Sequence, residues 1–250
     1  MERGNTMTSK EREVKILEIV RENKIVSFKN LLKELDIPST TLRRDLTRLD
    51  EEKKLVRFHG GAKAIEDINL DYYESQNYPD FDIKHSIAKK AVSLLNDEDI
   101  IFLDSGTTAY TMAKLIDNKT ITIYTTSVIA AMDLSKRGMK VFLIGGFIQN
   151  NISAIFGNDA LTLIAKKHFD KSFLASTALN EEEGFLTVYE EDAKIKSAVI
   201  NKSGQSYIMA SSKKFDEKAH ITFANNKDAI LITDKMPDIY RNSFSYIESH

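Results

Sequence analysis

The sequence predicts an α/β protein with a small N-terminal part and a larger C-terminal domain that contains a largely parallel sheet. Two observations lead to this fold class. Residues 1–66 hold three short amphipathic stretches and then two strand-like runs around a Gly-Gly pair. From Ile83 onward helix and strand patterns alternate, and the strand runs IIFL, VFLI and AILI are apolar throughout, as expected of strands covered on both faces. We therefore expect domains at 1–66 and 83–250, joined by a linker at 67–82.

The composition excludes several classes of protein. Of the 250 residues, 42% are hydrophobic and none is cysteine, which predicts a packed core without disulfides or thiolate chemistry. There is no run of about 18 apolar residues and no charged-then-apolar leader, so we expect neither a membrane span nor a signal peptide, and a cytoplasmic location. Residues 1–9 read as a flexible extension, in which Met7 is an alternative start.

The net charge of −2 is unevenly distributed. Residues 1–65 contain 15 Lys+Arg and 11 Asp+Glu, a balance of +4, and the remaining residues contain 20 and 26, a balance of −6. A basic end on an acidic body suits a protein that presents one end to nucleic acid. Because the excess is mild, we expect a dimer or higher oligomer to add contacts.

The N-terminal part is predicted to contain three helices. Glu11–Glu22 carries an apolar stripe, and Ile25-Val26 could form a short strand. Ser27 then caps a second helix, Phe28–Leu35, and after a short turn Ser39 is expected to cap the third. This order matches a helix-turn-helix, in which the last helix enters the major groove.

The third helix has two distinct faces. Leu42, Leu46 and Leu49 share one face at 100° per residue. The opposite face carries Thr40, Arg43, Arg44 and Thr47. Such a front can contact phosphates and base edges, where arginine can read guanine. Asp45 lies at the seam between the leucines and Arg48, which indicates a structural role.

A ribbon follows this helix. Leu55–Phe58 reads as a strand, Gly60-Gly61 as a tight turn and Ala62–Ile65 as a second strand, which together with the helix gives the pattern of a winged helix. Arg57 and Lys63 are expected on backbone phosphates, whereas His59 either touches a phosphate or packs and faces solvent. The residues expected at the DNA are Ser39, Thr40, Thr41, Arg43, Arg44, Thr47, Arg48, Arg57, His59 and Lys63. The alternative is a solvated amphipathic helix followed by an ordinary hairpin.

The C-terminal domain is predicted to alternate helices and strands. The expected helices are Ile83–Leu95, Thr107–Ile116, Val128–Arg137, Asn158–His168 and Glu190–Lys202. The expected strands are Ile100–Leu103, Ile121–Tyr124, Lys140–Ile144, Ser172–Ser176, Ser206–Met209 and Ala229–Ile232.

Three loops follow strands of this domain, where ligands of open α/β sheets bind. The first is 104–108, whose glycine lets a ligand approach and whose helix start favours an anion such as phosphate, with Asp104 free to accept from sugar hydroxyls. The second is hydroxyl-rich Thr125–Ser127 and the third is Gly145–Phe147. Lys171 and Lys196 could add positive charge. The same residues would also make plain capped turns.

Several of these segments resemble the DeoR family of bacterial transcriptional regulators. TLRRDL, VRFHGGA, FLDSGTT, LIGG, DKSFL, EEGF and ITD occur in the order typical of that family, over nearly all of residues 10–234. The resemblance implies an N-terminal DNA-binding domain and a C-terminal domain that is similar to sugar-phosphate isomerases and binds a phosphorylated sugar. It implies as effector-site residues Asp104, Ser105, Gly106, Thr107, Thr108, Thr126, Ser127, Gly145, Gly146, Lys171, Asp192 and Lys196.

The chain departs from that family pattern at four positions. Thr126 replaces an asparagine, Asp192 a glutamate, Ser211 an aspartate and Ala175 a frequent glycine. The changes at 126 and 211 shorten the hydrogen-bonding reach at the sugar end, so a changed effector or a lost one both stay open.

The resemblance implies a repressor of a sugar uptake or catabolic operon that binds double-stranded operator DNA as a dimer or tetramer. An isomerase-like enzyme with an accessory DNA-binding head is the alternative, but spacing forces no carboxylate pair together near the loops. A non-specific nucleic-acid-binding or scaffolding protein would need more positive charge. The five histidines are scattered, so neither a metal site nor a cofactor is expected.

Overall fold

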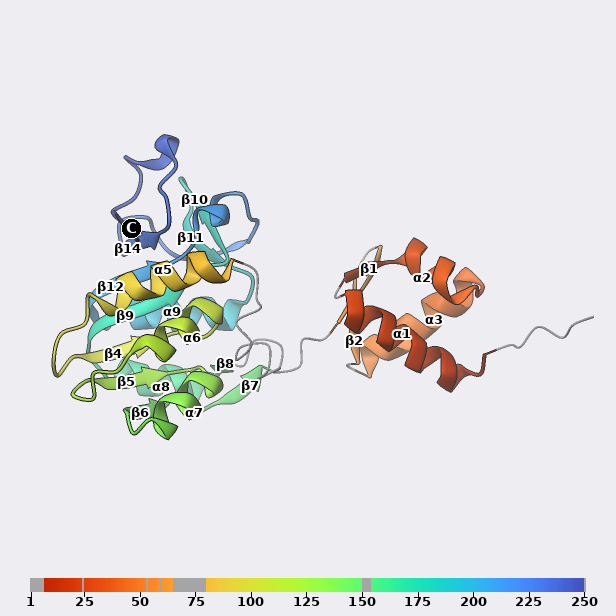
Figure 1. Cartoon of the computed structure of the whole chain (residues 1–250), viewed down its shortest axis with the longest axis horizontal. Helices are drawn as coiled ribbons and strands as arrows, with labels where there is room; N and C mark the ends of the chain where they lie inside the picture. The colour runs from red at the N-terminus through yellow and green to blue at the C-terminus, as the bar shows by residue number, and fades with distance from the viewer. Residues whose placement is uncertain are drawn as a thin grey trace, which may run out of the picture. The chain divides into compact units, whose positions relative to one another are not determined.

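The computed structural model describes residues 7–23, 25–52, 54–58, 60–64, 80–149 and 154–249. Contacts divide the chain into two units, Met1–Asp67 and Ile68–His250, each described here by itself (Figure 1). The predicted linker at 67–82 lies outside the described residues except for its last three positions, and so do residues 1–6 of the predicted extension.

The N-terminal unit packs three helices against a small antiparallel sheet. Its elements are α1 (Ser9–Asn23), β1 (Ile25–Ser27), α2 (Phe28–Leu35), α3 (Ser39–Glu51), β2 (Leu55–Phe58) and β3 (Gly61–Ala64). The strand order is β1-β3-β2, so the short first strand joins the ribbon. Leu42, Leu46 and Leu49 of α3 are buried in the core between the helices, as their spacing predicts.

The two predicted helix caps have different outcomes. Ser27 caps α2, since its hydroxyl accepts from the Asn30 N–H at 3.2 Å. The expected cap at Ser39 is wrong, because Ser39 is already helical and Pro38 holds the cap position without a side-chain hydrogen bond. The Pro38 carbonyl accepts from Thr41 and Leu42 instead, which starts the helix one residue earlier.

The C-terminal unit contains a seven-stranded sheet among its described residues, and every pairing in it is parallel. The order is β15-β14-β12-β9-β4-β5-β6. These strands are β4 (Ile100–Leu103), β5 (Thr122–Thr125), β6 (Lys140–Leu143), β9 (Phe169–Ala175), β12 (Ser203–Met209), β14 (Ile230–Thr233) and β15 (Tyr246–Glu248). The predicted fold class, a helix-turn-helix unit plus an α/β unit with a parallel sheet, is confirmed.

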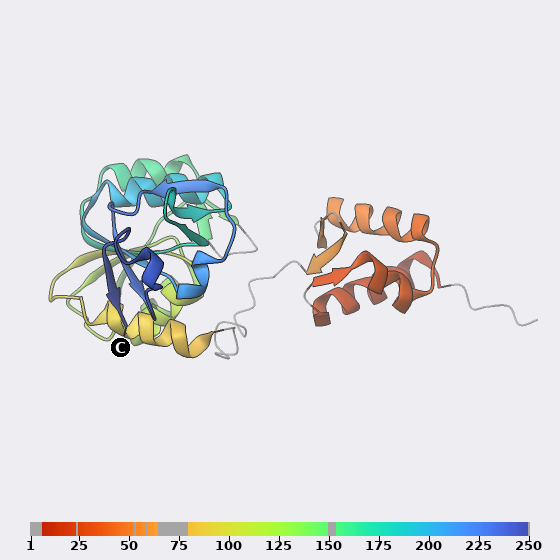
Figure 2. The same cartoon turned by 90° about the horizontal axis from the view of Figure 1, so that it is seen from above.

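Helices cover both faces of this sheet (Figure 2). One face packs against α5 (Phe81–Val92), α6 (Thr107–Leu115) and α7 (Val128–Lys136). The other packs against α8 (Asn158–Ala165) and α9 (Glu190–Ile200). The sheet therefore has a hydrophobic core on each side.

The C-terminal unit also contains short elements that the sequence did not predict. They are the hairpin β7 (Phe147–Gln149) and β8 (Ala154–Phe156), the small antiparallel sheet of β10 (Ala178–Asn180), β11 (Gly184–Thr187) and β13 (Ile221–Ala224), and the 3-10 turns η1 (Ser212–Phe215) and η2 (Asp238–Tyr240).

One expectation about the strands is wrong. The run VFLI was expected to be covered on both faces, but β6 is an edge strand whose Phe142 and Leu143 are both exposed. Apolar composition alone does not distinguish a central strand from an apolar edge.

Candidate nucleic-acid interface and effector site

One face of α3 packs into the core, and the opposite face, its front, is exposed to solvent. Thr40, Arg43 and Arg44 are exposed, while the leucines on the other face lie in the core. The Arg43 guanidinium lies over the Phe28 ring of α2, 5.4 Å from its centroid, and this contact restricts its side chain. Ser39 is exposed at the first turn and Thr41 is half-buried toward the side of the helix.

The ribbon reaches this front through Arg57. Its Nη1 donates to the Thr47 hydroxyl at 2.7 Å, and that hydroxyl donates in turn to the Arg43 carbonyl at 2.9 Å. The Arg57 N–H donates to Asp50 Oδ1 at 2.9 Å. The three predicted DNA residues Arg43, Thr47 and Arg57 are thus connected into one polar surface.

The turn end of the ribbon is fixed to the start of α2. The Phe28 N–H donates to the Gly60 carbonyl at 2.7 Å. A Cβ on Gly61 would lie 2.1 Å from the Val26 carbonyl oxygen, so only glycine allows this approach. The Gly-Gly pair therefore places the ribbon relative to the helices.

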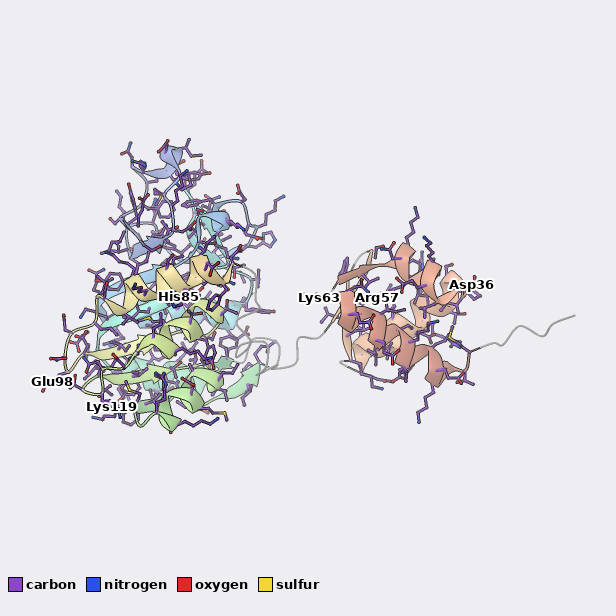
Figure 3. All side chains as sticks on the ribbon, viewed as in Figure 1. Asp36, Arg57, Lys63, His85, Glu98 and Lys119 are labelled. Atoms are coloured by element: carbon purple, nitrogen blue, oxygen red, sulfur yellow. The ribbon has the colours of Figure 1, made fainter. Side chains whose placement is uncertain are left out.

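The two cations of the ribbon lie on opposite faces. Lys63 pairs in register with Val56, and Arg57 is the next residue along that strand. Side chains alternate along a strand, so Lys63 shares a face with Val56 and not with Arg57. Figure 3 labels both residues in the N-terminal unit. His59 lies outside the described residues.

The structure does not place Arg48 with the front of α3. Its Nη1 donates to Glu13 of α1 and to Glu52, each at 3.0 Å, so the side chain is engaged toward α1. Hydrogen bonds from Lys54 and Arg48 lower the pKa of Glu13. Asp45 was expected at the seam between the leucine face and Arg48 with a structural role; it is buried and pairs with Arg12 of α1 at 2.9 Å, which agrees with that role.

In the C-terminal unit, the three predicted loops lie together at the carboxyl ends of the parallel strands. Leu103 at the end of β4 pairs in register with Phe173 of β9 and with Thr125 of β5, and Thr125 pairs with Leu143 of β6. Since all these strands are parallel, the loops that follow β4, β5 and β6 are neighbours. The loops are therefore close together, as the positions after parallel strands predict.

The first loop, between β4 and α6, begins with a buried carboxylate. Asp104 is 1% exposed, and its Oδ2 accepts from the Ala175 N–H at 2.8 Å. Gly106 has φ +96° and holds the cap position of α6 without a side-chain hydrogen bond. Ser105, Gly106 and Thr107 are partly exposed and Thr108 is buried. The loop can receive an anion at the helix start, where free N–H groups are favourable.

A buried ion cluster lies beside this loop. Lys196 Nζ is 2.7 Å from Asp192 Oδ2 and 3.4 Å from Asp104 Oδ2, and all three side chains are buried. Thr187 donates to Asp192 Oδ2 at 2.7 Å, and the ammonium lies 5.1 Å from the Phe223 ring centroid. Thr187 is a member that sequence reasoning missed, because only the packing of β11 against α9 brings it near.

The charges of this cluster are held in place by their surroundings. Burial raises the pKa of the Asp104 carboxyl, although the Lys196 ammonium acts against that rise. Burial alone would lower the pKa of Lys196, but attraction to Asp104 and Asp192 outweighs it and raises that pKa. Lys196 therefore stays an ammonium between two carboxyl groups, which can accept hydrogen bonds from hydroxyls of a ligand.

The residues of the other two loops mostly have structural roles. Thr126 and Ser127 are buried, and the Ser127 hydroxyl accepts from the Ala130 N–H at 3.2 Å as the cap of α7. A Cβ on Gly146 would lie 2.2 Å from the Phe156 carbonyl oxygen, so this glycine serves packing. Gly145 has nothing within 4 Å of such a Cβ and borders open space.

Lys171 does not lie with these loops, so its predicted place in the effector site is wrong. It lies near the start of β9, where its ammonium pairs with Asp99, the residue that precedes β4. Four residues of extended strand, about 13 Å, separate it from Ala175 at the carboxyl end. Lys171 thus belongs to the opposite end of the sheet.

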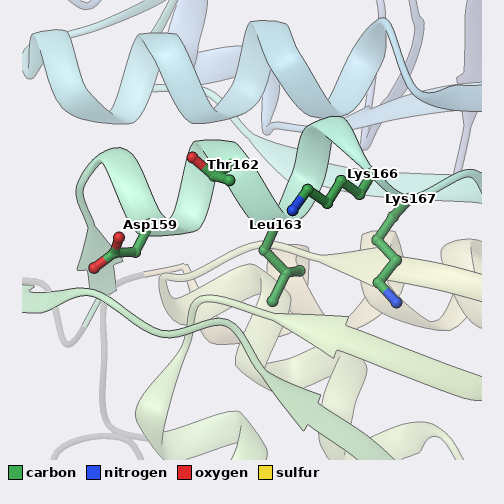
Figure 4. Close-up of a pocket in the computed structure, with 5 residues that line it drawn as sticks. All are labelled: Asp159, Thr162, Leu163, Lys166 and Lys167. Carbon is green, nitrogen blue, oxygen red and sulfur yellow. The ribbon is translucent and has the colours of Figure 1, made fainter.

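Two surface grooves of the C-terminal unit lie along its helices. One runs along α8 and is lined by Asp159, Thr162, Leu163, Lys166 and Lys167 (Figure 4). Another lies between α9 and β13. Neither is lined by the predicted effector residues, whose cluster is closed around Lys196 in this structure. Within the described ranges, no three acidic or histidine side chains are grouped to hold a metal, and no helix could cross a membrane.

Fold and sites together define a DNA-binding regulator with a separate sensor domain. Residues 12–67 match the DeoR-like helix-turn-helix domain, and residues 80–235 match the DeoR C terminal sensor domain. The chain belongs to the DeoR family. Because both units match this family of regulators, the chain is a DeoR-type transcriptional regulator and not an enzyme.

Two relatives and one solved structure are among the proteins to which this chain is similar. The HTH-type transcriptional regulator FruR of Bacillus subtilis is 34% identical over 91% of each chain. The lactose phosphotransferase system repressor of Streptococcus mutans is 26% identical over 93% of this chain and 94% of the relative. Ribose 5-phosphate isomerase A of Methanocaldococcus jannaschii is 17% identical over 53% of each chain, with a TM-score of 0.40.

Proposed function

We propose that the protein represses a sugar uptake or catabolic operon in the cytoplasm, as a homo-oligomer that a phosphorylated sugar releases from its operator or otherwise modulates. The observation that carries the proposal is the front of α3, where Arg43 and Arg44 are exposed. Arg43 already lies over the Phe28 ring, and Arg57 already donates to the Thr47 hydroxyl. Side chains fixed before binding lose less freedom at the DNA.

The proposed roles follow the geometry. Arg43 and Arg44 read base edges in the major groove, with Thr40 and Thr47 beside them, and Arg57 contacts a phosphate from the ribbon. Ser39 and Thr41 contact the DNA backbone at the margin of this surface. Lys63 lies on the ribbon face opposite Arg57 and is left out of the proposed contact. Arg48 is bound to Glu13 and Glu52 and orients α3 instead.

The effector is proposed to bind where the loops after β4, β5 and β6 meet. Its phosphate lies at the start of α6, near Ser105 and Thr107, and its hydroxyls donate to Asp104 or Asp192. The name of one relative, a repressor of the lactose phosphotransferase system, supports a sugar-linked role. A ligand shifts the equilibrium only if it prefers one arrangement of the regulator, which the closed Lys196 cluster would have to change.

The test is binding of the purified full chain to its own upstream DNA, with and without a panel of sugar phosphates. We expect a preference over random duplex that falls with salt, and release by one compound of the panel. Arg44→Ala should lose about tenfold or more in affinity if it reads a base. Lys227→Ala removes an exposed charge from the other unit and serves as its control.

Two outcomes would contradict the proposal. Equal binding to promoter and random duplex would remove the regulatory role. Specific binding that no sugar phosphate changes would remove the effector assignment, and Thr107→Val, which takes away one hydroxyl at the start of α6, would then leave every property unchanged.

A further inference from the structure

Phe28, the first residue of α2, contacts two parts of the predicted DNA surface. The carbon centre of the Arg43 guanidinium on α3 lies 5.4 Å from the centre of the Phe28 ring. The Phe28 backbone N–H donates to the Gly60 carbonyl of the ribbon at 2.7 Å. The side chain of Phe28 is therefore engaged with α3, while its backbone is engaged with the ribbon.

The Phe28 ring is itself held in place. It is partly buried and packs against the hydrophobic core of the N-terminal unit, which contains Leu31 and Leu42. The backbone that carries the ring is fixed as well, because the Ser27 hydroxyl caps α2 by accepting from the Asn30 N–H. A ring fixed in this way restricts the side chain that lies over it.

The two arginines at the front of α3 differ in this respect, although both are exposed. Arg43 lies over the Phe28 ring, and its carbonyl accepts from the Thr47 hydroxyl at 2.9 Å. Across the described residues, no hydrogen bond, ion pair or ring contact holds the Arg44 side chain. Because ordering a rotamer-rich side chain costs free energy on binding, Arg43 has less of this cost left than Arg44.

The contact with the ring leaves the hydrogen-bonding groups of Arg43 available. A cation is attracted to an aromatic face through its charge, whereas the guanidinium N–H donors point outward in their own plane. Within the part of the chain that the structure describes, none of these donors is bound to another protein group. The same guanidinium can thus rest on Phe28 and donate to O6 and N7 of a guanine.

We propose that Phe28 is a positioning residue for base readout, whose ring selects the conformer of Arg43 that reads a guanine in the major groove. The inference rests on the proposed function, since Arg43 has a base to read only if α3 enters the groove. It assigns to α2 a part in sequence specificity that acts through α3.

Removing the ring should weaken promoter binding modestly. Phe28→Leu keeps an apolar side chain against the core and the backbone bond to Gly60, so the ribbon stays in place. We expect an affinity loss of about two- to fivefold, the range of an exposed contact between a cation and a ring. Phe28→Tyr keeps the ring and should bind like the wild type. A Phe28→Leu chain that binds as tightly as the wild type would overturn the inference.

Two double-mutant cycles give the sharper test. Combined with Arg43→Ala, Phe28→Leu should cause no further loss, because the side chain that it positions is gone. Combined with Arg44→Ala, the matched control, it should cause the same loss as in the wild type. Equal coupling to both arginines, or none to Arg43, would overturn the positioning role. Thermal unfolding of each variant verifies that the affinities belong to folded chains.

Base-pair substitutions in the promoter separate positioning from a general structural role. The pair read by Arg43 is the one at which substitution no longer affects binding by Arg43→Ala. Phe28→Leu should lose discrimination at that pair and keep it at the pair that Arg44→Ala identifies in the same way. The dependence of affinity on salt should not change, since Phe28→Leu alters no charge. An equal loss of discrimination at every pair would overturn the inference.

The wild type separates this inference from the proposed function. A wild type that prefers its promoter to random duplex, with no coupling between Phe28 and Arg43, overturns the inference alone. A wild type without that preference overturns the function, and the positioning role with it. Nuclear magnetic resonance of the free full chain tests the contact itself. The Arg43 side-chain protons should show a ring-current shift that Phe28→Tyr keeps and Phe28→Leu loses, and an unchanged spectrum in Phe28→Leu would overturn the inference.

Discussion

Removing the ammonium of Lys196 should destabilise the C-terminal unit in a pH-dependent way. Lys196→Met keeps most of the side-chain length but leaves Asp104 and Asp192 buried with no cation between them. Removing one partner of a buried ion pair costs about 3–5 kcal/mol. An independent bound comes from protonation: neutralising an aspartate of ordinary pKa at pH 7 costs about 4 kcal/mol, so protonating both carboxyl groups limits the loss to about 8 kcal/mol.

The pH dependence follows from the same reasoning. In the wild type, burial raises the pKa of Asp104 and the Lys196 ammonium acts against that rise, so removing the ammonium raises this pKa further in the folded variant. A group whose folded pKa is raised contributes stability that is lost as pH increases. The deficit relative to wild type should therefore grow as pH rises from 5 to 7, with an upper limit for this one carboxyl of about 1.4 kcal/mol per pH unit.

Urea unfolding of the full chain, followed by circular dichroism at pH 5, 6 and 7, measures this deficit. The matched control is Lys194→Met on the same helix, whose side chain is 60% exposed and 3.8 Å from Glu190. It should change the unfolding free energy by less than about 0.5 kcal/mol at any pH. Equal losses for the two variants, or a deficit for Lys196→Met that does not vary with pH, would refute the reasoning.

Three further changes test how each unit is held together. Asp45→Ala leaves the partly buried Arg12 without its buried carboxylate partner and should lower the unfolding free energy of the N-terminal unit by about 3 kcal/mol in calorimetry; an unchanged transition would mean the pair is dispensable. Gly61→Ala should cost about 2 kcal/mol or more because its Cβ meets a backbone carbonyl, whereas Gly145→Ala should be nearly neutral in the same thermal scan. Arg137→Met removes donors to the last carbonyls of α6 and should cost about 2 kcal/mol in urea unfolding, with no loss counting against that capping role.

Local patterns in the sequence predicted the features that depend on neighbours along the chain. The leucine spacing of α3 fixed which side is buried and therefore which side presents Arg43 and Arg44. The loops after β4, β5 and β6 were expected together because parallel strands end at one edge. Both arguments need only the period of a helix or the direction of a strand.

Features that depend on distant partners were not predictable in this way. Arg48 reads as part of the α3 front until Glu13, 35 residues earlier, is known to lie beside it. Lys171 reads as a ligand residue until β9 is known to begin at Phe169, which places the lysine at the wrong end of the strand. Asp104 joins Lys196 only because β4 and α9, which lie far apart in the sequence, meet in the fold.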